Sequence, residues 1–170
     1  GSEYVVKIQD EDDDFKTEVD TLSKINRWVH APRIYGVWKC DGKGYIVMEK
    51  LFKLKFNPRE SFLRISEILD ELHSRFRIVL PDSHENNVMT RKDGTIVLID
   101  FGWALYFKNK NSVVSKTNFI TSQLGRPATM KEAILWETYI VAGAFGEKKI
   151  SRNSMSQIKA LKYKGSLRNK

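Results

Sequence analysis

The chain has 170 residues and a formal net charge of +8, and 41% of its residues are hydrophobic and 29% charged. These values are ordinary for a soluble globular protein, and the length predicts one domain that buries its core without disulfides. No segment holds the roughly 18 uncharged apolar residues of a membrane helix, so we expect no membrane contact.

The positive charge is concentrated at the carboxyl end. Residues 148–170, which we call the basic tail, carry eight Lys and Arg side chains and no acid, whereas the rest of the chain carries equal numbers of both signs. Two interpretations stay open: a solvated surface, or recruitment of an acidic partner, either nucleic acid or an acidic protein face. Tyr163 alone gives the tail no interleaved stacking pattern of aromatic residues, so sequence-specific nucleic-acid recognition is not predicted.

Two features bear on the cellular compartment. The single cysteine, Cys40, excludes an internal disulfide and favours a reducing compartment. The first residues are acidic rather than basic, and they predict no signal peptide. We therefore expect a cytoplasmic protein.

The amino-terminal third predicts a strand followed by a helix. Tyr4–Ile8 alternates as a strand does, with Lys7 on the face opposite Val6 and Ile8. An acidic run at residues 10–14 then precedes a helical stripe of apolar residues from Phe15 to Ile25. Acids before and within a first turn suit the positive end of a helix dipole, so the run marks a helix start.

A hairpin and a second helix are predicted next. Residues 34–40 and 44–49 read as two antiparallel strands around a turn at Asp41-Gly42. Asn57 and Pro58 then form a capped helix start, and apolar residues at spacings of three and four continue the helix to about residues 73–74.

The stretch at residues 78–103 carries the most informative pattern. Two short apolar strands flank a polar loop and turn at Asp93-Gly94. Asp82 and Asn87 form a D-x-x-x-x-N arrangement, and Asp100 opens Asp-Phe-Gly just after the second strand. This spacing can bring three oxygen-bearing side chains to one point.

The carboxyl-terminal third is less patterned. Residues 106–125 are polar and predict a long loop. A helix is expected from residues 127–129 to about Gly146, followed by a shorter basic helix over about residues 154–162.

Three of these segments together resemble the protein kinase-like superfamily. Phosphoryl transfer from ATP needs a lysine held on the phosphates, hard oxygen ligands for Mg²⁺ and a carboxylate beside the acceptor hydroxyl. Val5-Val6-Lys7-Ile8 resembles the V-A-I-K strand, Asp82 to Asn87 the catalytic loop, and Asp100-Phe101-Gly102 the metal-binding D-F-G. The resemblance covers about residues 4–103.

The resemblance implies a two-lobed α+β kinase-like fold that binds ATP and Mg²⁺. Residues 1–51 would form a partial amino-terminal lobe, residues 52–147 a reduced, mostly helical carboxyl-terminal lobe, and residues 148–170 a basic tail or helix. Lys7 would contact the ATP phosphates and pair with Glu18, with Glu11 as the competing partner.

The remaining site residues also follow from the resemblance. Residues 45–51 are similar to the strand and hinge that receive adenine. Met48 would be the gatekeeper, or an ordinary buried methionine, and the backbone of Glu49 and Leu51 would bond the base. Asp82 would orient the acceptor hydroxyl, while Asn87 and Asp100 would ligate Mg²⁺.

The sequence also departs from the family's pattern. Leu80-Pro81-Asp82 replaces His-Arg-Asp, so activation by loop phosphorylation is not expected. His84 gives D-x-H-x-x-N, a form similar to aminoglycoside and choline kinases and to some atypical and phage-encoded protein kinases, which leaves the substrate class open. His84 would steady the transferred phosphate or bond the loop backbone. No G-x-G-x-x-G precedes Lys7 and no A-P-E follows Asp-Phe-Gly.

The sequence thus predicts a minimal or atypical Ser/Thr protein kinase with a protein substrate. A small-molecule hydroxyl kinase and a pseudokinase that acts as a binding module are the alternatives. If the chain is a pathogen effector or a viral protein, the expected location is the host cytoplasm or nucleus. The sequence does not indicate which oligomeric state the protein has.

Overall fold

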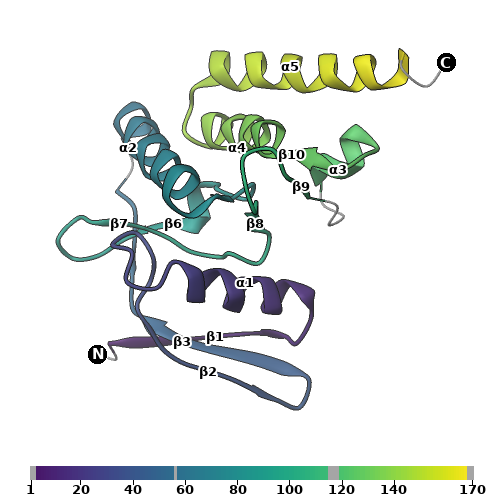
Figure 1. The fold of residues 1–170 in the computed structure, drawn as a ribbon. Helices are drawn as coiled ribbons and strands as arrows, with labels where there is room; N and C mark the ends of the chain where they lie inside the picture. The colour runs from purple at the N-terminus through teal and green to yellow at the C-terminus, as the bar shows by residue number, and fades with distance from the viewer. Residues whose placement is uncertain (1–2, 56, 115–118, 168–170) are drawn as a thin grey trace. The chain divides into compact units, whose positions relative to one another are not determined.

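The computed structural model describes residues 3–55, 57–114 and 119–167, and it is a mixed α+β structure with small sheets (Figure 1). The chain forms two compact units. The first unit holds Gly1–Lys55 and Glu85–Ala104, and the second holds Phe56–His84 and Leu105–Lys170. The predicted single lobe over residues 52–147 therefore differs from this division, because the hairpin after Glu85 packs with the amino-terminal residues.

The first unit is built on a three-stranded antiparallel sheet in the order β1-β3-β2. Its strands are β1 (Tyr4–Asp10), β2 (Ile34–Cys40) and β3 (Lys43–Glu49). Asp41 and Gly42 both have positive φ, of 51° and 72°, which suits a two-residue turn between twisted strands. The predicted hairpin is therefore confirmed.

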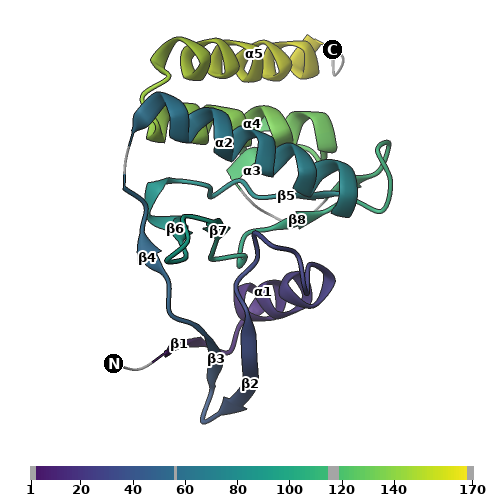
Figure 2. The ribbon, with the colours of Figure 1, turned by 90° about the vertical axis from the view of Figure 1, so that its left-hand side faces the viewer.

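Helix α1 (Asp13–Lys24) runs beside this sheet in both views (Figures 1 and 2). The Asp12 carboxylate caps it by accepting hydrogen bonds from the amides of Asp14 and Phe15. The Phe15 ring is fully buried over Gly44 of β3. The acidic run thus starts the helix, as the sequence predicts, and the first apolar residue of the stripe fastens it to the sheet.

The opposite face of the sheet carries exposed apolar side chains. Val6 and Ile8 of β1 are exposed, whereas Lys7 is half-buried on the α1 side, as the alternation predicts. Trp38 stacks on Tyr45 across the β2–β3 pair, with ring centroids 5.2 Å apart. Such cross-strand aromatic pairs stabilise a sheet from its solvent side.

A second sheet in the first unit carries the hairpin of residues 85–104. Its strand order is β4-β6-β7, with β4 (Phe52–Lys53), β6 (Val88–Thr90) and β7 (Ile96–Leu98). The Asp93 carboxylate accepts from the Thr95 amide and Gly94 has a φ of 86°, so the predicted turn is present. The 3-10 turn η2 (Glu85–Asn87) leads into β6.

The second unit is mostly helical, and α4 supplies its centre. Ala133 of α4 belongs to one apolar cluster with Val79 and Leu105, and Trp136 belongs to another with Ile120 and Ile158. The elements of this unit are α2 (Pro58–Glu71), the π-helical turn η1 (Leu72–Phe76), β5 (Ile78–Val79), β8 (Leu105–Tyr106), β9 (Val113–Val114), α3 (Phe119–Leu124), β10 (Ala128–Thr129), α4 (Met130–Ala144) and α5 (Lys148–Leu167). None of the helices described is long and apolar enough to cross a membrane.

Two predictions about the carboxyl-terminal third are wrong. Residues 106–125 are not one long loop, because β8 pairs with β5 and β9 pairs with β10. A strand of two residues is too short to show an alternating sequence pattern. It is recognised only by its pairing with a strand elsewhere in the chain. The basic helix begins at Lys148 rather than near 154, since Ser151 and Ser154 are buried together with Ile158, and small polar residues on the buried face conceal a helical stripe.

Gly44 offers a test of the α1–sheet packing. A Cβ at this position would overlap the buried Phe15 ring, whereas a Cβ at Gly36 would meet only Trp38, at 3.8 Å. We expect Gly44→Ala to lower the free energy of unfolding by about 1–3 kcal/mol, as overpacked core positions do, and Gly36→Ala to leave it nearly unchanged. Urea unfolding measures both, and equal losses in the two variants would contradict the packing described.

Candidate active site

The central feature of the first unit is the Lys7 ammonium, which lies between two carboxylates. Its Nζ is 2.7 Å from Glu18 Oε2 and 3.2 Å from Asp100 Oδ1. Gln9 donates a second hydrogen bond to Glu18 Oε2, at 2.7 Å. Strand β1, helix α1 and the segment after β7 therefore meet at one charged cluster.

The electrostatics of this cluster favour a charged lysine. Burial acts to lower the pKa of Lys7, but its hydrogen bond to Glu18 and the charges of Glu18 and Asp100 outweigh burial and raise that pKa above its ordinary value. The Glu18 side chain is only 1% exposed, whereas that of Asp100 is 45% exposed. The cluster thus fixes a cation beside a carboxylate that solvent and ligands can reach.

The Lys7–Glu18 ion pair is the one that the sequence predicts. Glu11, the competing partner, instead pairs with Lys39 at 2.7 Å on the exposed surface. The roles of Lys7 and Glu18 toward a nucleotide stay predictions.

Asp100 has an unusual backbone conformation. Its φ is 64°, in the left-handed region that residues other than glycine rarely adopt, although Asp tolerates it better than most. Such a residue costs about 1–3 kcal/mol and persists where its surroundings fix it. The next residue, Phe101, is fully buried, which anchors the segment and leaves the Asp100 carboxylate directed at Lys7.

Asn87 lies at the same end of the β6–β7 hairpin as Asp100. The Asn87 carbonyl accepts a hydrogen bond from the Ile99 amide at 2.9 Å, which extends the strand pairing to the residue before Asp100. A carboxylate and an amide oxygen are hard ligands that suit Mg²⁺, which takes few protein ligands and fills its octahedron with phosphate oxygens and water. Across the described residues there is no cluster of three or more His, Cys, Asp or Glu for a metal.

The segment expected to receive adenine is the end of β3. Met48 is buried in the sheet, where it pairs with Val5 and Ile34. The Glu49 amide donates to the Arg33 carbonyl at 3.0 Å, so this N–H is not available to a ligand. Of the Glu49 backbone, only the carbonyl is left to bond adenine. The predicted role of the Leu51 backbone is unchanged.

The Glu49 side chain has a role that the sequence did not suggest. Its carboxylate accepts from Arg91 Nη2 at 2.6 Å and Nε at 3.0 Å, and Arg91 also donates to the carbonyls of Val29 and Ala31. This pair joins β3, the α1–β2 loop and the β6–β7 hairpin. The two residues are 42 apart in sequence, and only their opposite charges could have hinted at the contact.

Asp82 and His84 belong to the second unit. His84 Nε2 lies 3.5 Å from Asp82 Oδ1, and both side chains are about one-third exposed. Between them, the buried Ser83 hydroxyl donates to the Leu80 carbonyl at 2.7 Å. The loop that carries Asp82 and His84 is therefore held by its own backbone.

Glu137 of α4 also holds this loop, and the sequence reasoning missed it. Its carboxylate is 2% exposed, accepts from the Leu80 amide at 2.6 Å, and lies 2.6 Å from His73 Nε2. Burial raises the pKa of Glu137, against the effects of His73 and the Leu80 amide. The signal in the sequence that could have revealed this role is the position of Glu137 among the apolar residues of α4.

The predicted site residues are thus divided between the units. Asp82 and His84 lie in the second unit, and the first unit holds Lys7, Glu18, Met48, Glu49, Leu51, Asn87 and Asp100. Within the first unit, the structure brings Lys7, Glu18 and Asp100 into direct contact and Asn87 next to Ile99.

No protein-family model matches the chain, and no curated protein matches it.

The Glu49–Arg91 pair predicts a pH-dependent contribution to stability. Burial acts to raise the pKa of Glu49, but its bonds to Arg91 and to the Arg33 amide lower it below the ordinary 4.5. A lowered carboxyl pKa contributes stability above the unfolded value, and that stability is lost as pH falls through the folded value. Glu49→Gln should therefore cost about 2 kcal/mol at neutral pH and progressively less below about pH 4.5.

Urea unfolding from pH 7 down to about pH 4 measures this difference. Glu71→Gln is the matched control, because Glu71 forms an exposed pair with Arg75 at 3.1 Å and its loss should cost under about 1 kcal/mol. A Glu49→Gln penalty that stays constant or grows as pH falls would contradict a lowered pKa for Glu49.

Proposed function

We propose that the protein is an ATP- and Mg²⁺-dependent phosphotransferase with a two-lobed protein kinase-like fold. The observation that carries the proposal is the Lys7 ammonium held between Glu18 and Asp100. A cation on a strand, fixed by a buried carboxylate on a helix and beside a second, accessible carboxylate, is the arrangement that nucleotide phosphates and their metal ion require. Ser or Thr of a protein is the proposed acceptor.

Lys7 would act as the fixed phosphate contact. Its raised pKa keeps it charged at neutral pH, and Glu18 with Gln9 limits its motion. A lysine side chain that is already held in place loses less conformational entropy on binding a phosphate than a free surface lysine does. Glu18 is thus a positioning residue, and Lys7 is the group that touches the nucleotide.

Asp100 and Asn87 would hold the metal ion. An Mg²⁺ ion held there would supply positive charge that neutralises the phosphates during transfer. Asp100 supplies an accessible carboxylate on a backbone fixed in the left-handed region, and Asn87, whose backbone carbonyl pairs with the Ile99 amide, would add its side-chain amide oxygen. Strain kept at a carboxylate that can be reached by solvent supports a functional role for Asp100.

Asp82 would orient the acceptor hydroxyl and take its proton. The loop that carries it is fixed on the inside by the Glu137 carboxylate on the Leu80 amide and by Ser83. His84, at 3.5 Å from Asp82, would steady the transferred phosphoryl group.

The order of the first sheet supports the kinase-like fold as well. Strands β1, β3 and β2 are antiparallel neighbours, α1 follows the lysine strand, and the segment after β3 leads out of the sheet as a hinge would. We propose a cytoplasmic location from the single, exposed cysteine. The basic tail would recruit an acidic partner.

A small-molecule hydroxyl kinase is the second candidate. The His84–Asp82 contact favours it, because a histidine two residues after the base is the form similar to aminoglycoside and choline kinases. The two functions differ only in the acceptor, so the same assay separates them.

Transfer of label from γ-labelled ATP tests the proposal. With Mg²⁺ and protein acceptors, the wild-type chain should transfer label, and Lys7→Ala and Asp100→Ala should each lower the rate at least about 100-fold. Lys43→Ala is the matched control, because Lys43 pairs with Asp10 on the exposed part of the same sheet. Its rate should equal that of the wild type.

Three outcomes would count against the proposal in different ways. Label transfer that stays at the wild-type rate in both Lys7→Ala and Asp100→Ala rules out this site. Transfer to small alcohols but not to proteins selects the second candidate. A wild-type chain that binds nucleotide without any transfer supports the pseudokinase alternative instead.

A further inference from the structure

One side of the β1-β3-β2 sheet presents apolar side chains to the surroundings of the molecule. The six side chains that we call the outer face are Tyr4, Val6 and Ile8 of β1, Tyr35 and Trp38 of β2, and Tyr45 of β3. The first five have exposed fractions between 46% and 59%. Helix α1 lies on the opposite side of the sheet, as both views show (Figures 1 and 2).

The strand register joins these side chains into one patch. Ile8 pairs with Tyr45 and Tyr45 pairs with Trp38, so the three form a row across the sheet. Trp38 stacks on Tyr45 with 5.2 Å between ring centroids, and Tyr4 meets Tyr35 edge-on at 4.8 Å. Single exposed apolar residues are normal on a protein surface, whereas a connected patch marks an interaction site.

The alternation along β1 also indicates a covered outer face. An antiparallel sheet with one solvated side directs apolar residues to its own core and polar residues to water. In β1, Val6 and Ile8 point away from α1, whereas Lys7 and Gln9 point toward Glu18. The apolar side chains of Val6 and Ile8 therefore do not serve the core of the first unit.

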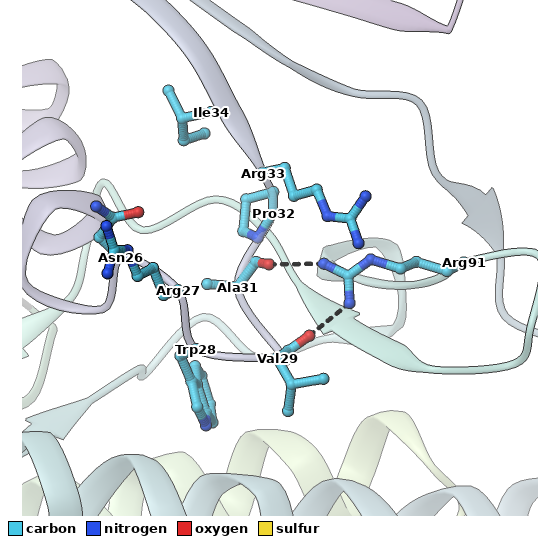
Figure 3. Close-up of a pocket in the computed structure, with 9 residues that line it drawn as sticks. All are labelled: Asn26, Arg27, Trp28, Val29, Ala31, Pro32, Arg33, Ile34 and Arg91. Carbon is cyan, nitrogen blue, oxygen red and sulfur yellow. Dashed lines mark hydrogen bonds between the residues drawn. The ribbon is translucent and has the colours of Figure 1, made fainter.

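The strands that carry the outer face are held in place. The loop that leads into β2 is fastened by Arg91, which donates to the carbonyls of Val29 and Ala31, as the dashed lines in Figure 3 mark. An ion pair between Asp10 and Lys43 joins β1 to β3. A surface that is already ordered loses little conformational entropy on association.

The area of the outer face suits an interface between two copies. At these exposed fractions, four aromatic side chains of about 150–250 Å² each, together with Val6 and Ile8, present on the order of 600 Å². Two such faces packed together remove up to about 1,200 Å² from water, which exceeds the roughly 1,000 Å² that a specific interface needs.

The charges of the first unit favour the same partner. This unit holds 12 basic and 13 acidic side chains, so two copies of it meet without strong repulsion. The outer face carries no charged side chain, and the charges at its ends are already paired, Asp10 with Lys43 and Glu49 with Arg91. An uncharged face does not select a charged partner, and it fits its own copy without like charges in contact.

We propose that two copies of the chain associate by packing their outer faces together, as the two sheets of a β-sandwich do. Sheets packed in this way keep their strand directions within about 30° of each other, because both have the same twist. The interface is isologous, so every substitution on it changes both copies. Since the outer face lies on the side of the sheet opposite Lys7, the proposal stands independently of the phosphotransferase activity.

Sedimentation equilibrium of the full chain over a range of concentrations tests the proposal. We expect a reversible equilibrium between monomer and dimer. Its association constant should stay constant or rise as salt is added, because the interface contains no ion pair. Association through the basic tail would instead weaken as salt rises, so a steep loss with salt overturns the proposal.

Substitutions on two different strands assign the contact to the outer face. Ile8→Lys and Trp38→Lys should each weaken the association at least about tenfold, since each places a charge in the apolar interface of both copies. Leu63→Lys is the matched control, because Leu63 is an equally exposed apolar residue on α2, and it should leave the association constant unchanged. Circular dichroism and urea unfolding of each variant, at concentrations where the wild type is monomeric, check that the fold is retained.

Three outcomes would overturn the proposal. A wild-type chain that stays monomeric up to its solubility limit shows that no second copy covers the outer face. Association that survives both substitutions in folded variants places the contact elsewhere. Weakening by Ile8→Lys but not by Trp38→Lys assigns the contact to the edge of β1 rather than to the outer face.

Discussion

Much of the first unit depends on one constraint, which is that the Glu18 carboxylate is buried and must be paired. An ionised carboxylate removed from water needs a cation and hydrogen bonds, and Lys7 and Gln9 supply them. That requirement fixes the register of α1 against β1. Lys7 then reaches Asp100, so the same ammonium defines where the segment after β7 must pass. The proposed catalytic geometry thus follows from satisfying one buried charge.

Two other carboxylates act in the same way. Glu49 joins three segments of the first unit through Arg91, and Glu137 holds the segment before Asp82 through the Leu80 amide. Each lies at the end of a strand or within a helix, where an unpaired backbone group or a cation is available. Removing one partner of such a pair is costly, and the pairs also define which segments meet, which is what a site built from distant parts of a chain requires.

The sequence predicts what is local and misses what is distant. Periodicity and turn residues predict β1, α1, the β2–β3 hairpin, α2 and α4. The Lys7–Glu18 pair follows from the resemblance to the kinase-like family, and the structure shows the two side chains in contact. Pairings such as β9 with β10, and the anchors Glu49 and Glu137, join residues whose own neighbours carry no signal. The sequence predicts a helix shorter than α5, because part of the buried face of α5 is formed by serine residues.

The central claim is that the Lys7 cluster binds nucleotide phosphates together with Mg²⁺. Calorimetric titration of ATP with and without Mg²⁺, in the wild type and in Asp100→Asn, tests it most directly, since Asp100 is half-exposed and the amide keeps its shape. The account predicts Mg²⁺-dependent binding by the wild type and an affinity at least about tenfold weaker, no longer dependent on Mg²⁺, in the variant. Equal ATP affinity in all four titrations, or no binding by the wild type, would contradict it.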